Sequence, residues 1–577
     1  MHIMIFLLYI LYFRIVLDSG LSADDMWNYN IKASEYTGGP NVWELTWNQF
    51  FVWLDMGRLF PFSNYVYILF QYVPSIAFYK VLVMLCTYIS NLLCGISLKK
   101  ITGQWCFGYM YMLLFLVFIQ LTPEFDSALY CYHMLVQLVV IWCFLSLWLM
   151  LQYLDTKKKR YMILSIVSYF IALGTYEVAY VFIFVLLLGI IIKERKWKEI
   201  VRTGSLYVAV ILIMGMLNVY LRVHGQTVAY DGIRLNLHIK PMIITLLKQC
   251  STCFPIGRYI CYGVRTTEPY SYLYPYNVKD IIKEVQALDV LVIVLFVGIF
   301  IVIERKIFTE KCMKKDTLWL IVGMGATLFL ITGTLIAVSM KYQNMLGWCS
   351  GHLPAYIQSM GLSIVILGIY AWLCWQEKKW KKIRILRFSC AILAIIVLLL
   401  NQITGRIGVE YMNLSRKYPQ ECLGEAANEG LFDEVAGDSG KIVFGITDYI
   451  YDISASRDFY SRYSKNNIYA VPRQDVIETL KDEGLGAKVY EIPADREQQF
   501  YAVYTVADQK NGLVIMGKCH SLQLDDAKVE FAHLWIENPK IYVYGNAYLP
   551  ERGQGEMYQL EGCYDLIQVK NTKGLTE

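Results

Sequence analysis

Two adjacent carboxylates, Asp24 and Asp25, follow directly after the first apolar segment of the chain. A carboxylate at the end of a membrane helix could act as a general base toward a hydroxyl group. The pair could also hold a divalent cation, Mg²⁺ or Mn²⁺, that bridges a phosphate leaving group. Aspartate is equally a preferred capping residue, so a short interfacial helix over residues 26–33 would account for the same two residues.

A second candidate is Arg58, which lies in the stretch Gly57-Arg58-Leu59-Phe60-Pro61-Phe62. A guanidinium near the membrane surface can bind a phosphate through two parallel hydrogen bonds. It can also extend along the apolar layer and place its charge among the lipid headgroups. The residue type allows both interpretations.

Five further residues are candidates for substrate binding. Glu177 interrupts a long apolar stretch, and ionisable residues at membrane depth suggest function, although a hydrogen-bonded turn explains it as well. The other four lie in one loop before Pro354, where a cation could meet an anionic lipid headgroup or be a solvated flank: Lys341, Tyr342, Gln343 and His352.

The composition indicates a membrane protein. Of 577 residues, 56% are hydrophobic and 18% are charged, and the mean hydropathy is +0.40. Soluble proteins carry about 25% charged residues. Apolar runs of about 20 residues recur, and each can cross a hydrocarbon core of about 30 Å. We therefore expect an all-α polytopic membrane bundle.

The apolar runs predict about eleven transmembrane helices. Gly174-Thr175-Tyr176-Glu177 divides the run 161–192, which we interpret as two short helices joined by a hairpin. The predicted segments are 3–17, 76–96, 105–121, 128–151, the two halves of 161–192, 205–221, 288–303, 318–338, 354–375 and 388–400.

Basic residues alternate between loops. Lys and Arg gather at 99–100, 157–160, 193–202, 305–315 and 378–387, and the intervening loops are poor in them. Positive loops remain in the cytoplasm, so the N-terminus is predicted to be cytoplasmic and the candidate residues to face outward. This charge is an orientation signal, and we expect no nucleic-acid partner.

The last part of the chain differs in charge. Residues 402–577 carry 18 Lys/Arg and 27 Asp/Glu, a net charge of −9, which leaves +14 for residues 1–401. Strand-like runs and one helical pattern predict a C-terminal extracytoplasmic α+β domain at 402–577, after a transmembrane domain at 1–401. The strands are expected at 441–445, 488–492, 500–506, 513–517 and 540–545, and the helix at 474–483.

The transmembrane half resembles the GT-C type membrane glycosyltransferases, and within them the bacterial O-antigen glucosyl transferase group. The resemblance is carried by Asp24-Asp25, by Gly57-Arg58-Leu59-Phe60-Pro61, and by Tyr176-Glu177 and Lys341-Tyr342-Gln343. It implies a polyprenyl-phosphate-linked sugar donor used on the outer face. Asp24 or Asp25 would serve as base or metal ligand, and Arg58 and Lys341 would hold the lipid phosphate.

The resulting hypothesis is a multi-pass transferase of the bacterial plasma membrane that glycosylates a cell-surface glycan acceptor. Two alternatives stay open: a transporter or flippase for lipid-linked sugars, and a non-catalytic assembly protein. Transporters often contain inverted repeats and broken helices. The sequence shows no repeat, which favours the enzyme.

Overall fold

The structure is a computed structural model of the 577-residue chain. Side chains and backbone are described for most of residues 1–409, and the backbone for the helix that continues to Ser415 and for eight later strands. The described helical part comprises residues 1–22, 24–29, 40–123, 127–194, 196–224, 234–255, 257, 283–309, 315–376 and 382–415.

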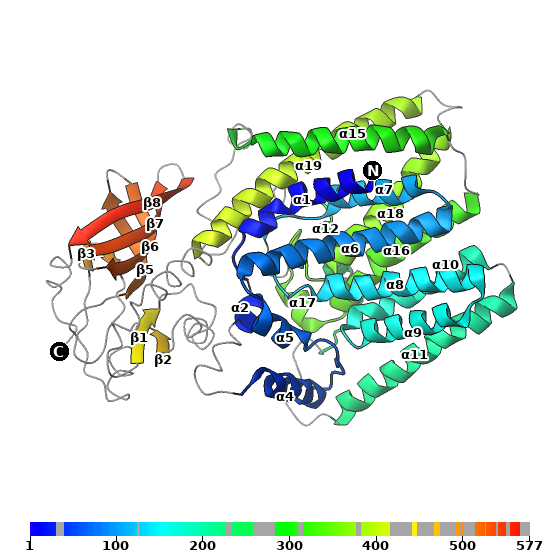
Figure 1. The fold of residues 1–577 in the computed structure, drawn as a ribbon, viewed down its shortest axis with the longest axis horizontal. Coiled ribbons are helices and arrows are strands. Elements are labelled where there is room, and N and C mark those ends of the chain that lie inside the picture. The colour runs from blue at the N-terminus through cyan, green and yellow to red at the C-terminus, as the bar shows by residue number, and fades with distance from the viewer. Residues whose placement is uncertain are drawn as a thin grey trace.

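The first 415 residues are helical in every long element that the structure describes (Figure 1). The first helices are α1 (His2–Asp18), α2 (Asp24–Tyr29), α4 (Val42–Asp55), α5 (Tyr65–Tyr72), α6 (Ile76–Thr102), α7 (Trp105–Phe118), α8 (Leu135–Thr156) and α9 (Lys159–Leu173). A 3₁₀ turn, η1 (Glu177–Val181), precedes α10 (Phe182–Lys193), α11 (Trp197–His224), α12 (Ile239–Ser251), α15 (Ala287–Thr309), α16 (Lys315–Ala337), α17 (Met340–Met345), α18 (Ala355–Gln376) and α19 (Lys382–Ser415).

The chain is a multi-pass membrane protein. Within the described residues, seven helices are long and apolar enough to cross a membrane: α6, α8, α11, α15, α16, α18 and α19. Each of the eleven predicted segments forms a helix, and residues 174–176 separate α9 from η1 and α10 as expected. The other four helices, α1, α7, α9 and α10, have 17, 14, 15 and 12 residues. The total of eleven spans stays a prediction.

Three predicted boundaries are wrong. The helix expected from residue 128 begins at Leu135, because the preceding residues form a tightly bonded loop. The helix expected at 205–221 begins at Trp197. The last helix continues beyond residue 400 to Ser415, since Asn401 and Arg406 are buried and bonded to other helices instead of ending the span. It thus passes through the predicted domain boundary at 401–402.

Small residues allow the helices to approach closely. A Cβ atom on Gly361 of α18 would lie 2.6 Å from the carbonyl oxygen of Gly325 on α16, so only glycine fits at this crossing. Such contacts are typical of membrane helix pairs, because apolar lipid gives little hydrophobic drive for association. Buried tyrosines add polar contacts: the Tyr9 and Tyr12 hydroxyls of α1 donate to backbone carbonyls of α7 at 2.9 and 2.6 Å.

The loops divide between two ends of the bundle. At the basic end, Lys100 and Lys193 both contact Asp155, at 2.6 and 3.2 Å. The other end, which we call the site end, gathers the described residues 19–22, 24–29, 56–75, 119–123, 127–134, 174–177, 234–255 and 338–354. There the Phe62 N–H donates to the Gly174 carbonyl at 3.0 Å. This grouping follows the alternation of basic loops along the sequence, while the side of the membrane that each end faces stays a prediction.

The described residues of the tail are strands. β1 (Lys441–Ile446) pairs in parallel with β2 (Asn467–Pro472), and β3 (Ile492–Ala494) pairs with β4 (Gln498–Phe500). An antiparallel sheet follows in chain order: β5 (Val514–Leu524), β6 (Ala527–Glu537), β7 (Lys540–Leu549) and β8 (Gln554–Asp565). The predicted strands at 441–445, 513–517 and 540–545 are confirmed. The predicted helix at 474–483 lies outside the described residues, and the extracytoplasmic α+β domain stays a prediction.

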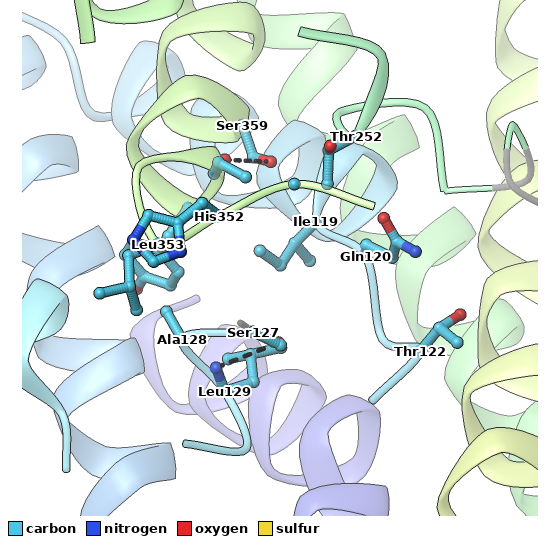
Figure 2. A pocket seen from close by; sticks show the side chains of 13 residues that line it. Ile119, Gln120, Thr122, Ser127, Ala128, Leu129, Thr252, His352, Leu353 and Ser359 are labelled. Atoms are coloured by element: carbon cyan, nitrogen blue, oxygen red, sulfur yellow. Dashed lines mark hydrogen bonds between the residues drawn. The ribbon is translucent and has the colours of Figure 1, made fainter. Parts of the chain in front are cut away.

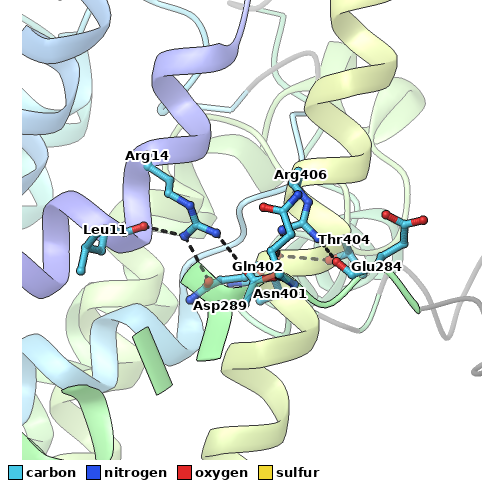
Figure 3. Close-up of polar contacts among 9 residues, drawn as sticks. Leu11, Arg14, Glu284, Asp289, Asn401, Gln402, Thr404 and Arg406 are labelled. Atoms are coloured by element: carbon cyan, nitrogen blue, oxygen red, sulfur yellow. Dashed lines mark hydrogen bonds and ion pairs between the residues drawn. The ribbon is translucent and has the colours of Figure 1, made fainter. Parts of the chain in front are cut away.

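A buried ion cluster joins α1, α15 and α19 at the site end (Figure 3). Asp289 at the start of α15 is fully buried and accepts from Arg14 of α1 at 2.5 Å and from Arg406 of α19 at 2.9 Å. Arg406 also donates to the Glu284 carbonyl. These contacts explain how the short first helix accommodates Arg14.

We predict that Asp289→Ala destabilises the protein strongly. Removing one partner of a buried ion cluster costs about 3–5 kcal/mol, because the remaining charges lose their compensation. Thermal unfolding in nanodiscs should show a midpoint lowered by several degrees. Asp316→Ala is the matched control, since Asp316 occupies the first turn of α16 and is exposed. Equal midpoints for the two variants would contradict the prediction.

Candidate functional site

The two adjacent aspartates occupy different environments. Asp25 is fully buried, whereas Asp24 is exposed at the start of α2. The Tyr79 hydroxyl of α6 donates to one oxygen of Asp25, and the backbone N–H of His133 donates to the other at 2.5 Å. Asp25 therefore joins three segments: α2, the start of α6, and the loop before α8.

Burial governs the charge of Asp25. Removal from water raises the pKa of Asp25 to about 7, and the nearby Lys80 ammonium, the Tyr79 hydroxyl and the His133 N–H each oppose this rise. Burial also lowers the pKa of His133 to about 3, so its imidazole is neutral. The 3.8 Å approach of His133 Nδ1 to Asp25 is consequently not an ion pair.

The loop Ser127–Met134 adopts an unusual backbone. Tyr132, His133 and Met134 have φ values of 65°, 39° and 64°, a left-handed conformation that costs roughly 1 kcal/mol or more for each such residue. Strain of this kind persists where surrounding contacts fix the chain. Here Lys80 Nζ donates to the Tyr130 carbonyl at 3.3 Å, and the Tyr65 hydroxyl donates to the His133 carbonyl at 2.6 Å.

A second cluster surrounds Arg58. Its guanidinium lies over the rings of Trp53 and Phe60, at 4.8 and 4.6 Å, and reaches Glu177 at 3.5 Å. Arg222, in the last turn of α11, contacts the other oxygen of Glu177 at 2.9 Å. Two of the predicted residues, Arg58 and Glu177, are thus brought together, and the structure adds a second arginine.

The end of α11 holds this cluster in place. Asn218 accepts from the Leu59 N–H at 3.0 Å and donates to the Tyr180 hydroxyl of η1 at 3.0 Å. Gly57 has a φ of 74° and lies so close to α11 that a Cβ atom would be 2.9 Å from the Cα of Arg222. Three segments distant in sequence therefore present their charged side chains to one another.

The loop before α18 gathers three other predicted residues. The rings of Tyr342 and His352 are 4.4 Å apart, and Lys341 Nζ lies 5.6 Å from the Tyr342 ring. His352 is buried, and its ring also meets Tyr132 of the strained loop at 6.0 Å. This contact places the Tyr342–His352 pair next to the loop that binds Asp25.

His352 lines a small pocket with residues of that same loop. Figure 2 shows Ser127, Ala128 and Leu129 below this pocket and His352 across from Gln120. The open space within it is about 30 Å³, enough for one or two water molecules and too small for a sugar ring. The pocket separates His352 from Gln120 without offering a substrate cavity.

Gln343 is engaged within the protein. Its amide accepts from the Asn236 side chain at 2.7 Å and donates to the Asn236 and Ala337 carbonyls, each at 2.8 Å. These three hydrogen bonds tie residues 234–236 to the end of α16. The predicted role of Gln343 in substrate binding stays untested.

The described residues give little support to a metal centre. They contain no group of three or more His, Cys, Asp or Glu side chains that could hold a metal ion. Both oxygens of Asp25 already accept hydrogen bonds from the protein. These residues do not fit a divalent cation as they stand.

Sequence reasoning missed several residues of these clusters. Lys80 and Tyr79 lie in an apolar run that resembles an ordinary span, and Arg222 lies where a span ends. A lysine within an apolar segment is costly and could have been singled out, because ionisable residues there suggest function. Nothing local in the sequence indicates that His133 offers its backbone N–H to Asp25.

Comparison with known proteins identifies no family. No protein-family model matches the sequence, and no curated protein matches it. Among solved structures, the chain is similar to the crystal structure of ArnT from Cupriavidus metallidurans bound to undecaprenyl phosphate. The match has 11% identity, covers 81% of this chain and 84% of that one, and has a TM-score of 0.36. The resemblance to the O-antigen group is not confirmed.

The raised pKa of Asp25 predicts a pH-dependent stability. The folded state binds this proton more tightly than the unfolded chain, in which the carboxyl has its ordinary pKa of 3.8. The contribution is therefore complete below about pH 4 and lost as the pH rises toward 7. Asp25→Asn, which stays neutral, should have a flatter dependence of the unfolding midpoint between pH 5 and pH 8.

Thermal unfolding of nanodisc-embedded protein across that pH range measures this slope. Asp24→Asn is the matched control, because the exposed neighbour should leave the wild-type slope in place. If Asp25→Asn and the wild type show the same dependence of the unfolding midpoint on pH, Asp25 does not titrate between pH 5 and pH 8.

Proposed function

We propose that the protein is a membrane glycosyltransferase that moves a sugar from a polyprenyl-phosphate donor to a cell-surface glycan. The observation that carries this proposal is the different environment of the two adjacent aspartates. Asp24 is exposed, and Asp25 is buried and bonded to two other segments. The cluster of Arg58, Glu177 and Arg222 lies at the same end of the bundle.

A lipid-linked donor explains why such chemistry would need a membrane bundle. The polyprenyl chain remains in the bilayer while its phosphate reaches the surface, where arginines can bind it. The alternation of basic loops supports a cytoplasmic N-terminus and an extracytoplasmic site end. We place transfer on the outer face of a bacterial plasma membrane, with the C-terminal domain on that side.

In the proposed reaction, the acceptor hydroxyl oxygen attacks the anomeric carbon of the donor sugar. Asp24 accepts the hydroxyl proton, because its carboxylate is the one that an incoming acceptor can reach. The bond between the anomeric carbon and the phosphate oxygen breaks, and the phosphate leaves with the electron pair. Arg58 stabilises the charge that develops on that phosphate.

Asp25 is a positioning residue in this mechanism. Its hydrogen bonds hold α2 against α6 and the strained loop, and this contact orients Asp24. The adjacent rings of Tyr342 and His352, with Lys341 beside them, would provide a surface next to the same loop for a sugar or lipid headgroup. We propose that Gln343 positions this surface without touching the substrate.

A transfer assay with purified protein in nanodiscs tests the assignment. We expect label from polyprenyl-phosphate hexoses to move to a glycan extract. Asp24→Asn should lower kcat by at least about 100-fold without lowering the unfolding midpoint, since loss of a general base typically costs 10²- to 10⁴-fold. Asp55→Asn, an exposed acid at the last residue of α4, is the control and should keep wild-type kcat.

Three outcomes bear on the alternatives. Full activity of Asp24→Asn would refute the role of Asp24 as base. Movement of the lipid-linked sugar across the membrane without a new glycosidic bond would favour a flippase. Loss of transfer in EDTA, restored by Mg²⁺ or Mn²⁺, would establish a cation that the described side chains do not by themselves hold.

A further inference from the structure

The geometry points to a two-arginine phosphate site, formed by Arg58 and Arg222, in which the Glu177 carboxylate is the resting occupant. This inference rests on the proposed function and adds Arg222 and a role for Glu177. We propose that the phosphate of the leaving polyprenyl phosphate replaces Glu177 between the two guanidiniums.

The contacts describe an anion held between two cations. One oxygen of Glu177 lies 3.5 Å from Arg58 and the other lies 2.9 Å from Arg222. Guanidiniums that bind a carboxylate in this way present the same donors to a phosphate. The three side chains come from the turn after α4, from η1, and from the end of α11, so each can change its partner without unfolding a helix.

Exposure distinguishes the three side chains. Arg58 has a side-chain exposure of 10% and packs against two aromatic rings, whereas Glu177 and Arg222 are exposed by 31% and 37%. A fixed Arg58 is suited to stay in place as the anion changes. The more exposed Glu177 can turn into water, where its charge is hydrated at little cost.

The charges favour the product over the donor. With Glu177 in place the cluster has a net charge of +1, and without it the two arginines carry +2. A sugar-linked lipid phosphate is a diester with one negative charge, while the released monoester carries about −1.5 to −2 at pH 7. Because the second charge develops as the bond to the sugar breaks, engagement of Arg222 would stabilise the transition state more than the bound donor.

A simpler interpretation assigns Arg222 to the helix end alone. Cations in the last turn of a helix interact favourably with its dipole, and Arg222 is in the last turn of α11. The two interpretations predict different effects of neutralising Glu177. If Glu177 competes with phosphate, its neutralisation tightens phosphate binding; if it binds substrate or only orients the arginines, its neutralisation weakens binding or has no effect.

The test is a titration of the full-length protein in detergent with undecaprenyl phosphate, read by native mass spectrometry. Glu177→Gln should bind about two- to fivefold more tightly, because it removes the competing carboxylate and an exposed ion pair holds that carboxylate only weakly. Arg222→Gln should bind about tenfold more weakly. In Arg222→Gln, the binding of phosphatidylglycerol, a phosphodiester lipid, should fall less than the binding of the monoester undecaprenyl phosphate. A titration with inorganic phosphate shows whether the two arginines bind the phosphate group without a lipid chain.

Glu199→Gln and Arg202→Gln are matched controls. They form an exposed pair at the opposite end of the same helix, 2.7 Å apart, and should leave binding unchanged. Suppose that the wild type binds undecaprenyl phosphate and Arg58→Gln binds it more weakly. If Glu177→Gln then binds with equal or lower affinity than the wild type, this inference is overturned and the proposed function stands. Absence of undecaprenyl phosphate binding by the wild type would overturn both.

Discussion

The buried carboxylate of Asp25 is the contact on which the site end of this protein depends. An isolated charge in such a place is costly, and Lys80, the Tyr79 hydroxyl and the His133 N–H offset only part of this cost. The Asp25 side chain fixes α2 to α6, and it also bonds a loop that contains three successive residues in the left-handed conformation. The same loop then contacts His352 through Tyr132. Asp25 thus links the segment that carries the exposed Asp24 to the loop that contacts the Tyr342–His352 pair.

The segment between Arg58 and Tyr65 connects this carboxylate to the arginine cluster. At one end Arg58 reaches Glu177, and at the other the Tyr65 hydroxyl bonds the strained loop. A base for the acceptor and cations for the leaving phosphate would thus be carried by elements that pack directly on one another. Glycosyl transfer from a lipid phosphate requires both groups, because one oxygen loses a proton while another gains charge.

Much of the helical framework could be predicted from the sequence, since apolar runs and basic loops are strong local signals. The break at Gly174 is an example, as an unbroken run would have disturbed the charge alternation. The predicted helix boundaries were wrong where tertiary contacts outweighed local composition. Helix α19 continues through Asn401 and Arg406 because these residues bond to other helices. Helix α8 begins late because residues 127–134 are held by Asp25 and Lys80. The pairing of Arg58 with Glu177 spans 119 residues, and no local pattern encodes it.

The difference between Asp24 and Asp25 illustrates what sequence could not resolve. Adjacent residues of one type have the same local chemistry, and only the packing of α2 decides which faces inward. The aspartate that faces inward becomes an anchor, and its neighbour stays exposed. The sequence could therefore identify the pair but could not assign a role to either member.

A structure of the protein in nanodiscs with undecaprenyl phosphate would test the central claim most directly. The account predicts the phosphate within hydrogen-bonding distance of Arg58 and Arg222, with Glu177 turned away, at the end of the bundle that carries Asp24. A phosphate bound at the basic end near Lys100 and Lys193, or at mid-membrane with Glu177 still between the two arginines, would contradict it.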